Sequence, residues 1–173
     1  MEVMSKENQL KFLTDVLKTL GLEPTYNRLH WLMAQAQVEN TKAKNNPLAT
    51  TWNMASIDPG QTTFNSAGVK NYGSWAIGVK ATANTLKQQN YYPYSYSLLQ
   101  SDTSALAPGL NTAKLTAEYK TYGGTSGYWS TLLSWAKNSA LAEFVKKNSS
   151  QILGGSTLLL LALGLIWWGL KKD

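Results

Sequence analysis

The sequence contains no cysteine and only one histidine, His30, among its 173 residues. Without cysteine, the chain can form neither a disulfide framework nor a thiolate metal site. A single histidine argues against Ser–His and His–Cys catalytic arrangements and against metal sites built from several histidines. The ten aspartates and glutamates are therefore the main candidates for catalysis, and we expect the protein to work without a metal or another cofactor.

Basic tracts of the kind that bind nucleic acid are also missing. Sixteen basic residues against ten acidic ones give a net charge of +6, but Arg28 is the only arginine and no nucleic-acid motif is present. We therefore expect no nucleic-acid partner. The excess of lysine suits an anionic membrane or an anionic cell wall, or it only keeps the protein soluble.

The N-terminal stretch lacks the uninterrupted apolar run of a secretory signal. Met1–Asn8 is polar, and the apolar positions that follow are interrupted by lysine and aspartate, so we expect no signal peptide. The pattern over Lys6–Leu20 predicts an amphipathic helix. Its leucine stripe favours packing on a core, with a helix on a membrane surface as the alternative.

A second helix is expected to begin near Pro24 and to end at Glu39. Its buried face is a helical stripe of four apolar residues: Leu29, Leu32, Met33 and Ala36. His30 lies off this stripe. We therefore predict that it is at the surface, or that it lies behind the residues that contact a substrate. The helix dipole disfavours a negative charge at a helix C-terminus. If Glu39 is partly buried there, its pKa will be raised, which is what a general acid needs.

Two short segments rich in threonine, Leu48–Asn53 and Thr62–Ser66, predict a small β-hairpin. Between them, Pro59 and Gly60 suit the central positions of a type II turn. Asp58 is expected to stabilise that turn rather than to act as a catalyst. With the helices on both sides, these strands predict an α+β fold that is predominantly α.

Further helices are expected after this hairpin, and Ser74 is a suitable N-cap for the first of them. The expected order is a helix to about Gln89, a short helix from Pro93 to Leu99, a linker over Ser101–Asn111, a helix over Ala113–Tyr122 and a flexible break at Gly123–Gly127. An amphipathic helix over Tyr128–Lys147 then packs on the domain or lies on a bilayer. We interpret 1–127 as the globular domain and 128–150 as an amphipathic juxtamembrane helix.

The last apolar segment, Ile152–Leu170, contains no charged residue. As a helix it would be about 28 Å long, enough for a hydrocarbon core of about 30 Å. Trp167 and Trp168 lie near one end, where interfacial aromatic residues are found. We therefore interpret 151–171 as a single-pass C-terminal transmembrane helix, with a buried hairpin element as the alternative. Its orientation stays open.

Three strings carry a resemblance to a known family: NNPLATT at Asn45–Thr51, FNSAGVKNY at Phe64–Tyr72 and GVKATANTL at Gly78–Leu86. Over roughly residues 20–101, the chain resembles the lysozyme-like domains of bacteriophage-associated murein hydrolases and lytic transglycosylases. The resemblance implies a lysozyme-like domain with a small β-hairpin, and peptidoglycan as the substrate, cleaved at the MurNAc–GlcNAc β-1,4 bond. In those proteins the acid lies at a helix end shortly before the Asn-Pro, which corresponds to Glu39.

The same resemblance suggests which residues contact the glycan. Four side chains are expected to hydrogen-bond N-acetyl groups and orient the sugar, and two residues are expected to form the floor of the cleft. The first group is Asn46, Thr51, Asn65 and Tyr72, and the second is Ser66 and Gly68. For the two asparagines, hydrogen bonds within a turn or hairpin are an equal alternative.

The number of acids near the hairpin bears on the reaction. Glycosidases that use water normally need a second carboxylate. Asp58 is the only acid near the hairpin, and Asp102 and Glu118 are farther along the chain. A lytic transglycosylase needs one acid/base alone, here Glu39, because the sugar's own hydroxyl attacks. We therefore favour a lytic transglycosylase over a hydrolytic muramidase or endolysin.

The anchor predicts where such an enzyme works. A tail-anchored domain reaches a cell wall if it is packaged with the internal membrane of a phage virion, so we expect a virion-associated enzyme that aids genome passage through the wall. Its expected partners are peptidoglycan glycan strands, the lipid bilayer and other virion membrane or capsid proteins. The alternatives are a lysis protein in the host cell membrane and an inactive structural virion protein with a lysozyme-like fold. The last is motivated by Asn40 and Thr41, because family members usually have glycines directly after the acid.

Overall fold

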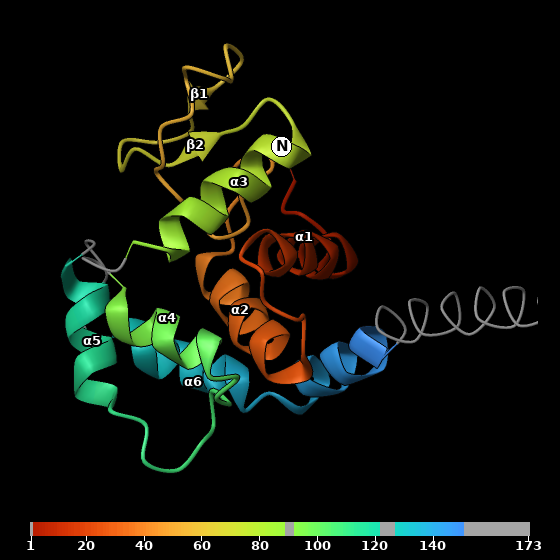
Figure 1. The fold of residues 1–173 in the computed structure, drawn as a ribbon, viewed down its shortest axis with the longest axis vertical. Helices are drawn as coiled ribbons and strands as arrows, with labels where there is room; N and C mark the ends of the chain where they lie inside the picture. Colours follow the sequence, from red (N-terminus) through yellow and green to blue (C-terminus); the bar gives the residue numbers. More distant parts are fainter. Residues whose placement is uncertain (1, 89–91, 122–126, 151–173) are drawn as a thin grey trace, which may run out of the picture.

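The computed structural model describes residues 2–88, 92–121 and 127–150 (Figure 1). Within these ranges the chain is mostly helical with one two-stranded sheet, which confirms the expected predominantly α class. The labelled elements are α1 (Lys6–Thr19), α2 (Tyr26–Glu39), β1 (Thr62–Thr63), β2 (Lys70–Asn71), α3 (Trp75–Leu86), α4 (Pro93–Gln100), α5 (Thr112–Thr121) and α6 (Tyr128–Ala136). A further helix covers 139–150.

Helix α1 forms where the leucine stripe predicted it, and both of its ends are capped locally. The Ser5 side chain accepts a hydrogen bond from the backbone N–H three residues later. At the other end, Gly21 has a φ of 72°, and the Leu22 N–H donates to the Leu17 carbonyl at 2.9 Å. This is a Schellman arrangement, which satisfies the last carbonyls and stops the helix.

Helix α2 is the centre of the helical body, with α1 packed on one side and α6 on another (Figure 1). Every residue from Leu29 to Ala36 is buried. Of the two positions predicted for His30, the one at the surface is therefore wrong, because its side chain is 2 % exposed. A single apolar stripe indicates one buried face, but two helices cover α2 from different sides. Burial lowers the pKa of His30, so the imidazole is neutral at physiological pH.

The remaining helices extend this body in a continuous series of contacts. Helix α3 packs on α1, α6 packs on α2 and α5, and α5 packs on α4. One hydrophobic core runs through all of these contacts. The ends of two helices follow the sequence closely, because the Ser74 side chain caps α3 and Pro93 occupies the first turn of α4.

The small sheet does not form between the two segments that the sequence suggested. Strand β1 pairs antiparallel with β2, with Thr62 opposite Asn71. The segment Leu48–Asn53 is loop, so its assignment as a strand is wrong. The turn of the hairpin lies at Asn65–Gly68, where the Gly68 N–H donates to the Asn65 carbonyl at 3.0 Å. Gly68 has a φ of 84°, a conformation that glycine adopts without steric cost.

The Pro59–Gly60 turn exists but has a different geometry and role from those predicted. The Gln61 N–H donates to the Asp58 carbonyl at 3.0 Å, which closes a β-turn. Gly60 lacks the positive φ that a type II turn requires at its third position. The type II prediction is therefore wrong. The buried Asp58 carboxylate accepts a hydrogen bond from the Gly73 N–H at 2.8 Å, and this bond joins the turn to the start of α3.

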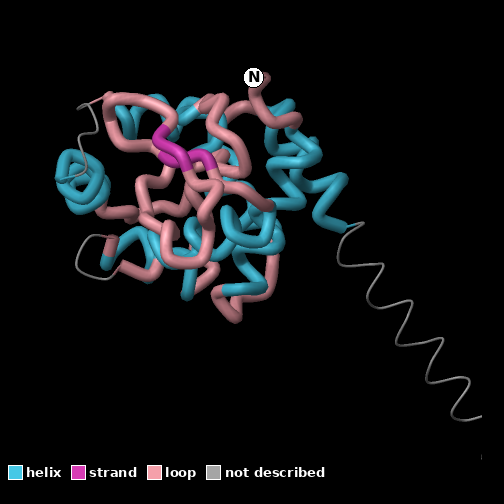
Figure 2. Tube along the Cα trace, turned by 90° about the horizontal axis from the view of Figure 1, so that it is seen from above, coloured by secondary structure: helices cyan, strands magenta, loops and turns pink. Residues whose placement is uncertain are grey.

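Loops gather around the two strands (Figure 2), and together they form a lobe at one end of the helical body (Figure 1). A small apolar cluster joins this lobe to α3, in which Met54 and Tyr72 of the lobe and Ala81 of the helix are buried. It docks closely on α3 at Gly78. A Cβ built on Gly78 would lie 2.1 Å from the Asn45 carbonyl oxygen, so any side chain at this position would separate the lobe from the helix.

The C-terminal part of the described chain differs from the predicted single helix over Tyr128–Lys147. Helix α6 ends at Ala136, and a second helix begins at residue 139. The side chain of Asn138 causes the break, since its Oδ1 accepts the Leu141 N–H at 3.0 Å as an N-cap does. The sequence left open what the apolar face of this segment contacts. In the structure, Trp129 and its apolar neighbours are buried against the helical body.

No helix within 2–88, 92–121 and 127–150 is long and apolar enough to span a bilayer. The predicted transmembrane helix, 151–171, lies outside the residues that the structure describes.

Candidate functional site

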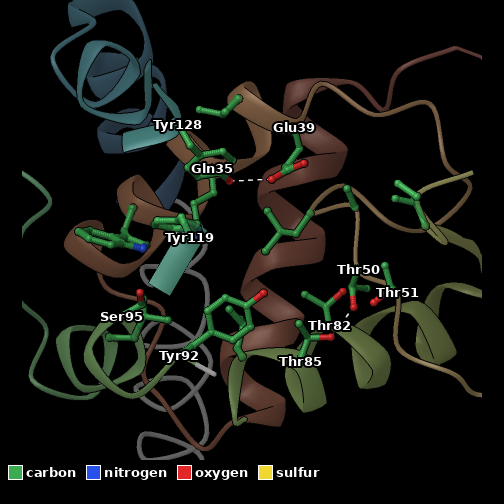
Figure 3. Close-up of a pocket in the computed structure, with 18 residues that line it drawn as sticks. Gln35, Glu39, Thr50, Thr51, Thr82, Thr85, Tyr92, Ser95, Tyr119 and Tyr128 are labelled. Atoms are coloured by element: carbon green, nitrogen blue, oxygen red, sulfur yellow. Dashed lines mark hydrogen bonds between the residues drawn. The ribbon is translucent and has the colours of Figure 1, made fainter. Parts of the chain in front are cut away.

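A pocket of about 430 Å³ lies between the helical body and the loop lobe (Figure 3). Helices α2 and α3 form two of its walls, α4 contributes two side chains, and α5 and α6 contribute one each. The 48–51 loop and the hairpin close the pocket from the lobe. Its lining mixes aromatic, hydroxyl and amide side chains with one carboxylate. Such a mixture suits a ligand that has both apolar faces and many hydrogen-bonding groups.

The α2 wall of the pocket is a stripe of residues one helical turn apart. Trp31, Gln35 and Glu39 stand at i, i+4 and i+8, which places them on one line along the helix. Glu39 is the last residue of α2, so the line ends with the carboxylate at the negative end of the helix dipole.

The Glu39 carboxylate is partly buried and has one tight hydrogen bond. The Tyr128 hydroxyl donates to its Oε1 at 2.6 Å. Burial raises the pKa of Glu39, and the hydrogen bond from Tyr128 lowers it by less, so the pKa lies above the usual range of a glutamate. The shift has the expected direction, but its cause is burial, whereas the sequence argument invoked the helix dipole.

Two stacked tyrosines support this arrangement. The rings of Tyr119 and Tyr128 are 4.3 Å apart with an interplanar angle of 27°, and the Tyr119 hydroxyl accepts a hydrogen bond from the Gln35 side-chain amide. Burial raises the pKa of both tyrosines, so both phenols stay neutral and keep their protons for donation. None of the three residues around Glu39, namely Gln35, Tyr119 and Tyr128, was predicted from the sequence as part of the site. Only the helical spacing of Gln35 from Glu39 could have indicated one of them.

The other acids considered from the sequence have structural roles and do not themselves line the pocket. Asp58 holds the Gly73 N–H, as described above. Glu118 accepts hydrogen bonds from the N–H groups at the start of α4, including that of Ser95 at 3.0 Å. Asp102 accepts from the Thr25 hydroxyl. Among the described residues that line the pocket, Glu39 is the only carboxylate.

Of the residues predicted to bind the glycan, the structure brings Thr51 to the pocket with Glu39. Gly68 lies at the same rim, since a Cβ built on it would be 3.9 Å from the Thr51 methyl carbon. Ser66 is exposed and precedes the pocket-lining Ala67. The loop tip is therefore next to the pocket, although neither Ser66 nor Gly68 is part of its lining.

The two asparagines and the tyrosine are engaged in the fold instead. Asn46 is fully buried, and its amide donates to the carbonyls of Thr50 and Lys70 at 2.8 and 2.7 Å. The Asn65 side chain accepts from the N–H of Val69 within the hairpin turn. For both, the turn and hairpin alternative describes what the structure shows.

Tyr72 is fully buried, and its hydroxyl donates to the Trp52 carbonyl at 2.8 Å. The expected contact of Tyr72 with a sugar is therefore not available in this structure. Burial raises the pKa of Tyr72 to about 12, which agrees with its position inside the lobe rather than in the pocket.

No family model matches the chain, and no curated protein or solved structure matches it either. The lysozyme-like resemblance therefore stays a prediction from the sequence. Within the part of the chain that the structure describes, no group of three histidine, aspartate or glutamate side chains could hold a metal ion.

Proposed function

We propose that this protein is a membrane-anchored peptidoglycan-degrading enzyme with a lysozyme-like fold. It acts as a lytic transglycosylase that cleaves the MurNAc–GlcNAc β-1,4 bond, and Glu39 is its sole acid/base. One observation carries the proposal: Glu39, with a raised pKa, is the only carboxylate among the described residues that line the pocket. A mechanism with two carboxylates has no second group to use there.

In the first step, Glu39 acts as a general acid. Its raised pKa increases the fraction of the carboxyl group that is protonated at any given pH. The carboxyl proton passes to the glycosidic oxygen, the bond between that oxygen and the anomeric carbon breaks, and the electron pair stays on the leaving oxygen. The acid of hen-type lysozyme is adapted in the same direction, because its apolar environment raises its pKa.

In the second step, Glu39 acts as a general base. The primary hydroxyl of the same sugar attacks the anomeric carbon, and its proton passes to the Glu39 carboxylate. The sugar closes to an anhydro ring, and the carboxyl group is regenerated for the next cycle. No water and no second carboxylate take part, so one acid/base is sufficient.

Tyr128 supports both steps by positioning the carboxyl group. Its hydroxyl donates a hydrogen bond to Oε1 of Glu39. We therefore expect Oε2 of Glu39 to carry the proton that is transferred. The same hydrogen bond is stronger when Glu39 is a carboxylate. It therefore stabilises the charged state that follows protonation of the substrate.

The residue after the acid also supports an intact site. Family members usually have glycine there, whereas this chain has Asn40, which adopts a left-handed conformation with a φ of 39°. Asparagine is, after glycine, a residue that tolerates this conformation well. The departure from glycine therefore keeps the backbone conformation at the end of α2, and this weighs against the inactive structural alternative.

We place the enzyme at a membrane because of the apolar 151–171 segment, which carries no charge until Lys171. The setting proposed is the internal membrane of a phage virion, where the domain meets the host wall during infection. Purified particles should contain the protein and lose it when lipid is extracted with detergent. Recovery in the host envelope fraction alone would favour the lysis-protein alternative.

The enzymatic proposal is tested by clearing of a peptidoglycan gel. The full chain should clear it, and Glu39→Gln should not. Glu143→Gln, at an exposed position of the 139–150 helix, is the matched control and should clear the gel as the wild type does. Equal clearing by all three proteins would show that Glu39 is not the acid. Absence of clearing by all three would favour a structural protein.

A further inference from the structure

The loop lobe and α3, residues 40–88, carry charges of almost one sign. They contain five lysines and a single acid, Asp58. The Asp58 side chain is 3 % exposed, and its carboxylate accepts the Gly73 N–H at 2.8 Å. The exposed side chains of this region are therefore basic or neutral. The five lysines are Lys42, Lys44, Lys70, Lys80 and Lys87.

Elsewhere in the described chain the two signs almost balance. Outside residues 40–88, the described ranges contain nine basic and eight acidic residues. Most of the positive charge excess therefore lies on the lobe and α3, and we call the surface with these five lysines the basic surface. Charge that only keeps a protein soluble has no reason to gather in one region, whereas charge that attracts a partner does.

The ammonium groups of the basic surface are available to a partner. Lys70 donates to the Thr63 hydroxyl at 3.0 Å. The other four lysines are exposed, and none of the five forms an ion pair with a described carboxylate. Lysine is a point charge without the bidentate fork of arginine. Five separate lysines therefore suit several spaced anions better than one planar anionic group.

The basic surface borders the pocket that contains Glu39. Half of the 18 residues that line the pocket come from 40–88. Lys70 directly follows the lining residue Val69, and Lys87 directly follows the lining residue Leu86. A polymer that enters the pocket and continues past the lobe or past α3 therefore meets these lysines.

The basic surface lies away from the end of the chain that leads to the proposed membrane anchor. Figure 1 shows the hairpin at the upper end of the molecule, and α6 and the 139–150 helix in the lower half. In the proposed anchoring, the bilayer is next to residue 150. The hairpin then points away from that bilayer, so a wall beside the membrane suits the basic surface better than the membrane itself.

We propose that the basic surface binds the carboxylates of the peptide stems of peptidoglycan while the pocket holds the glycan. This choice of ligand rests on the proposed function. Every second sugar of the glycan carries a short peptide with free carboxylates, so the strand is a polyanion whose charges stand off the sugar rings. Each exposed ion pair contributes little alone, but several together give affinity and attract the wall from a distance.

The test measures how tightly the full chain in detergent sediments with purified peptidoglycan that is free of attached phosphate polymers. The protein carries Glu39→Gln, so the wall stays intact. The free amines of the wall are acetylated, and half of the sample then has its carboxylates converted to amides. We expect binding to the sample with carboxylates to be at least about tenfold tighter at low salt, and the difference to shrink as added salt screens the charges.

A triple variant locates the binding on the basic surface. Lys42→Gln, Lys44→Gln and Lys87→Gln together remove three exposed charges. Affinity for the wall with carboxylates should fall about five- to tenfold, because three ion pairs are lost. Affinity for the amidated wall should stay unchanged. The Tm should also stay unchanged, since none of these side chains is buried.

The matched control removes the same net charge from exposed lysines outside 40–88, through Lys6→Gln, Lys18→Gln and Lys137→Gln. This variant should keep its affinity for the wall within about twofold. An equal loss in both triple variants would show that net charge alone matters, and the basic surface would have no special role.

Three further results would overturn the proposal. They are an unchanged affinity of the Lys42, Lys44 and Lys87 variant, equal binding of the parent protein to both walls, and binding only to a wall that keeps its phosphate polymers. The last result would identify phosphate groups as the partner instead of the stem carboxylates.

Failure of the basic surface and failure of the proposed enzyme can be told apart. With Glu39 restored, the Lys42, Lys44 and Lys87 variant should have a raised KM on the wall and a kcat within about twofold of the wild type. If the wild type clears peptidoglycan but the variant binds as the parent does, the enzymatic proposal stands and the basic surface falls. If the wild type clears none but binding depends on these lysines and on wall carboxylates, the basic surface stands and the catalytic proposal falls.

Discussion

The Tyr128 hydroxyl donates a 2.6 Å hydrogen bond to Glu39 Oε1, and so joins the start of α6 to the end of α2 across 89 positions of the sequence. The site around Glu39 is therefore complete only when the C-terminal helices have packed on α2. Tyr128 also stacks on Tyr119, which holds the phenol in place.

Replacing Tyr128 with phenylalanine should change the pH dependence of wall cleavage. The hydrogen bond from Tyr128 lowers the pKa of Glu39, so its loss raises that pKa further. Glu39 then stays protonated to higher pH, and the descending limb of the pH–rate profile should move upward. Because a bond to a charged group is lost, kcat/KM should fall about tenfold or more.

The control for that experiment is Tyr96→Phe, a buried tyrosine of α4 that does not line the pocket. Its pH profile should match that of the wild type. If Tyr128→Phe lowers the rate but leaves the pH values of both limbs of the profile unchanged, Tyr128 has no role in setting the pKa of Glu39.

The raised pKa of Glu39 also predicts how stability depends on pH. Folding raises the pKa by burial, so the folded state binds more protons than the unfolded state between the two pKa values. The contribution of Glu39 is most favourable below its unfolded pKa, about 4.3, and is lost as pH rises through the folded value. Glu39→Gln has no charge to bury, and its Tm should exceed that of the wild type near neutral pH but not near pH 4.

The measurement is a series of thermal melts of both proteins across this pH range. A wild type that becomes more stable relative to Glu39→Gln as pH rises would show the opposite sign. That result would mean that Glu39 is stabilised as a carboxylate and is a poor general acid.

Asp58 and Glu118 should matter for stability and not for chemistry. Asp58→Asn weakens the bond to the Gly73 N–H, and Glu118→Gln removes an acceptor from the start of α4. We expect each to lower the free energy of unfolding by about 1–2 kcal/mol. Cleavage rates measured well below the Tm should stay within about twofold of the wild type, since neither carboxylate is on the pocket. A loss of activity in the folded Asp58→Asn protein would favour hydrolysis with two carboxylates.

Gly78→Ala should separate the loop lobe from α3. The added Cβ would lie 2.1 Å from the Asn45 carbonyl oxygen, which backbone movement alone can relieve. We expect a loss of about 3 kcal/mol or more in the free energy of unfolding, measured by urea denaturation. Gly60→Ala is the matched control, because the nearest atom to its Cβ would be the Asp58 Oδ1 at an ordinary 3.5 Å. A loss of similar size in the control would contradict this account.

The helices before residue 122 were predictable because their signals are local, whereas the break after Ala136 was not predicted. The leucine stripe and Gly21 fix α1, and the Ser74 side chain caps α3. The end of α2 at Glu39 also followed from the sequence. Each of these signals acts within a few residues, so no knowledge of the packing was needed.

Features that depend on distant contacts could not be predicted. His30 lies off the apolar stripe of α2, yet it is buried because two helices cover α2. The hairpin pairs β1 with β2, whereas the Pro59–Gly60 signal pointed to a turn between other segments. The turns at Pro59–Gly60 and at Asn65–Gly68 both exist. The local sequence does not decide which of the two connects the paired strands.

The candidate site likewise contains residues that local sequence indicated and residues that only tertiary packing brings to it. The NNPLATT string indicated Thr51, and the predicted end of the second helix indicated Glu39. Both residues line the pocket. An asparagine side chain can hydrogen-bond within a turn or to a sugar. The residue type of Asn46 alone therefore does not decide between a structural role and a binding role. Tyr128 and Thr82 come from helices that reach the pocket only through tertiary packing, and no local pattern marks them.

The central claim is that Glu39 is the sole acid/base of a lytic transglycosylase. Mass spectrometry of the muropeptides that the full chain releases from purified peptidoglycan tests it most directly. The account predicts anhydro ends from the wild type and from Asp58→Asn, and no release by Glu39→Gln. Reducing ends from the wild type, or continued release by Glu39→Gln, would contradict it.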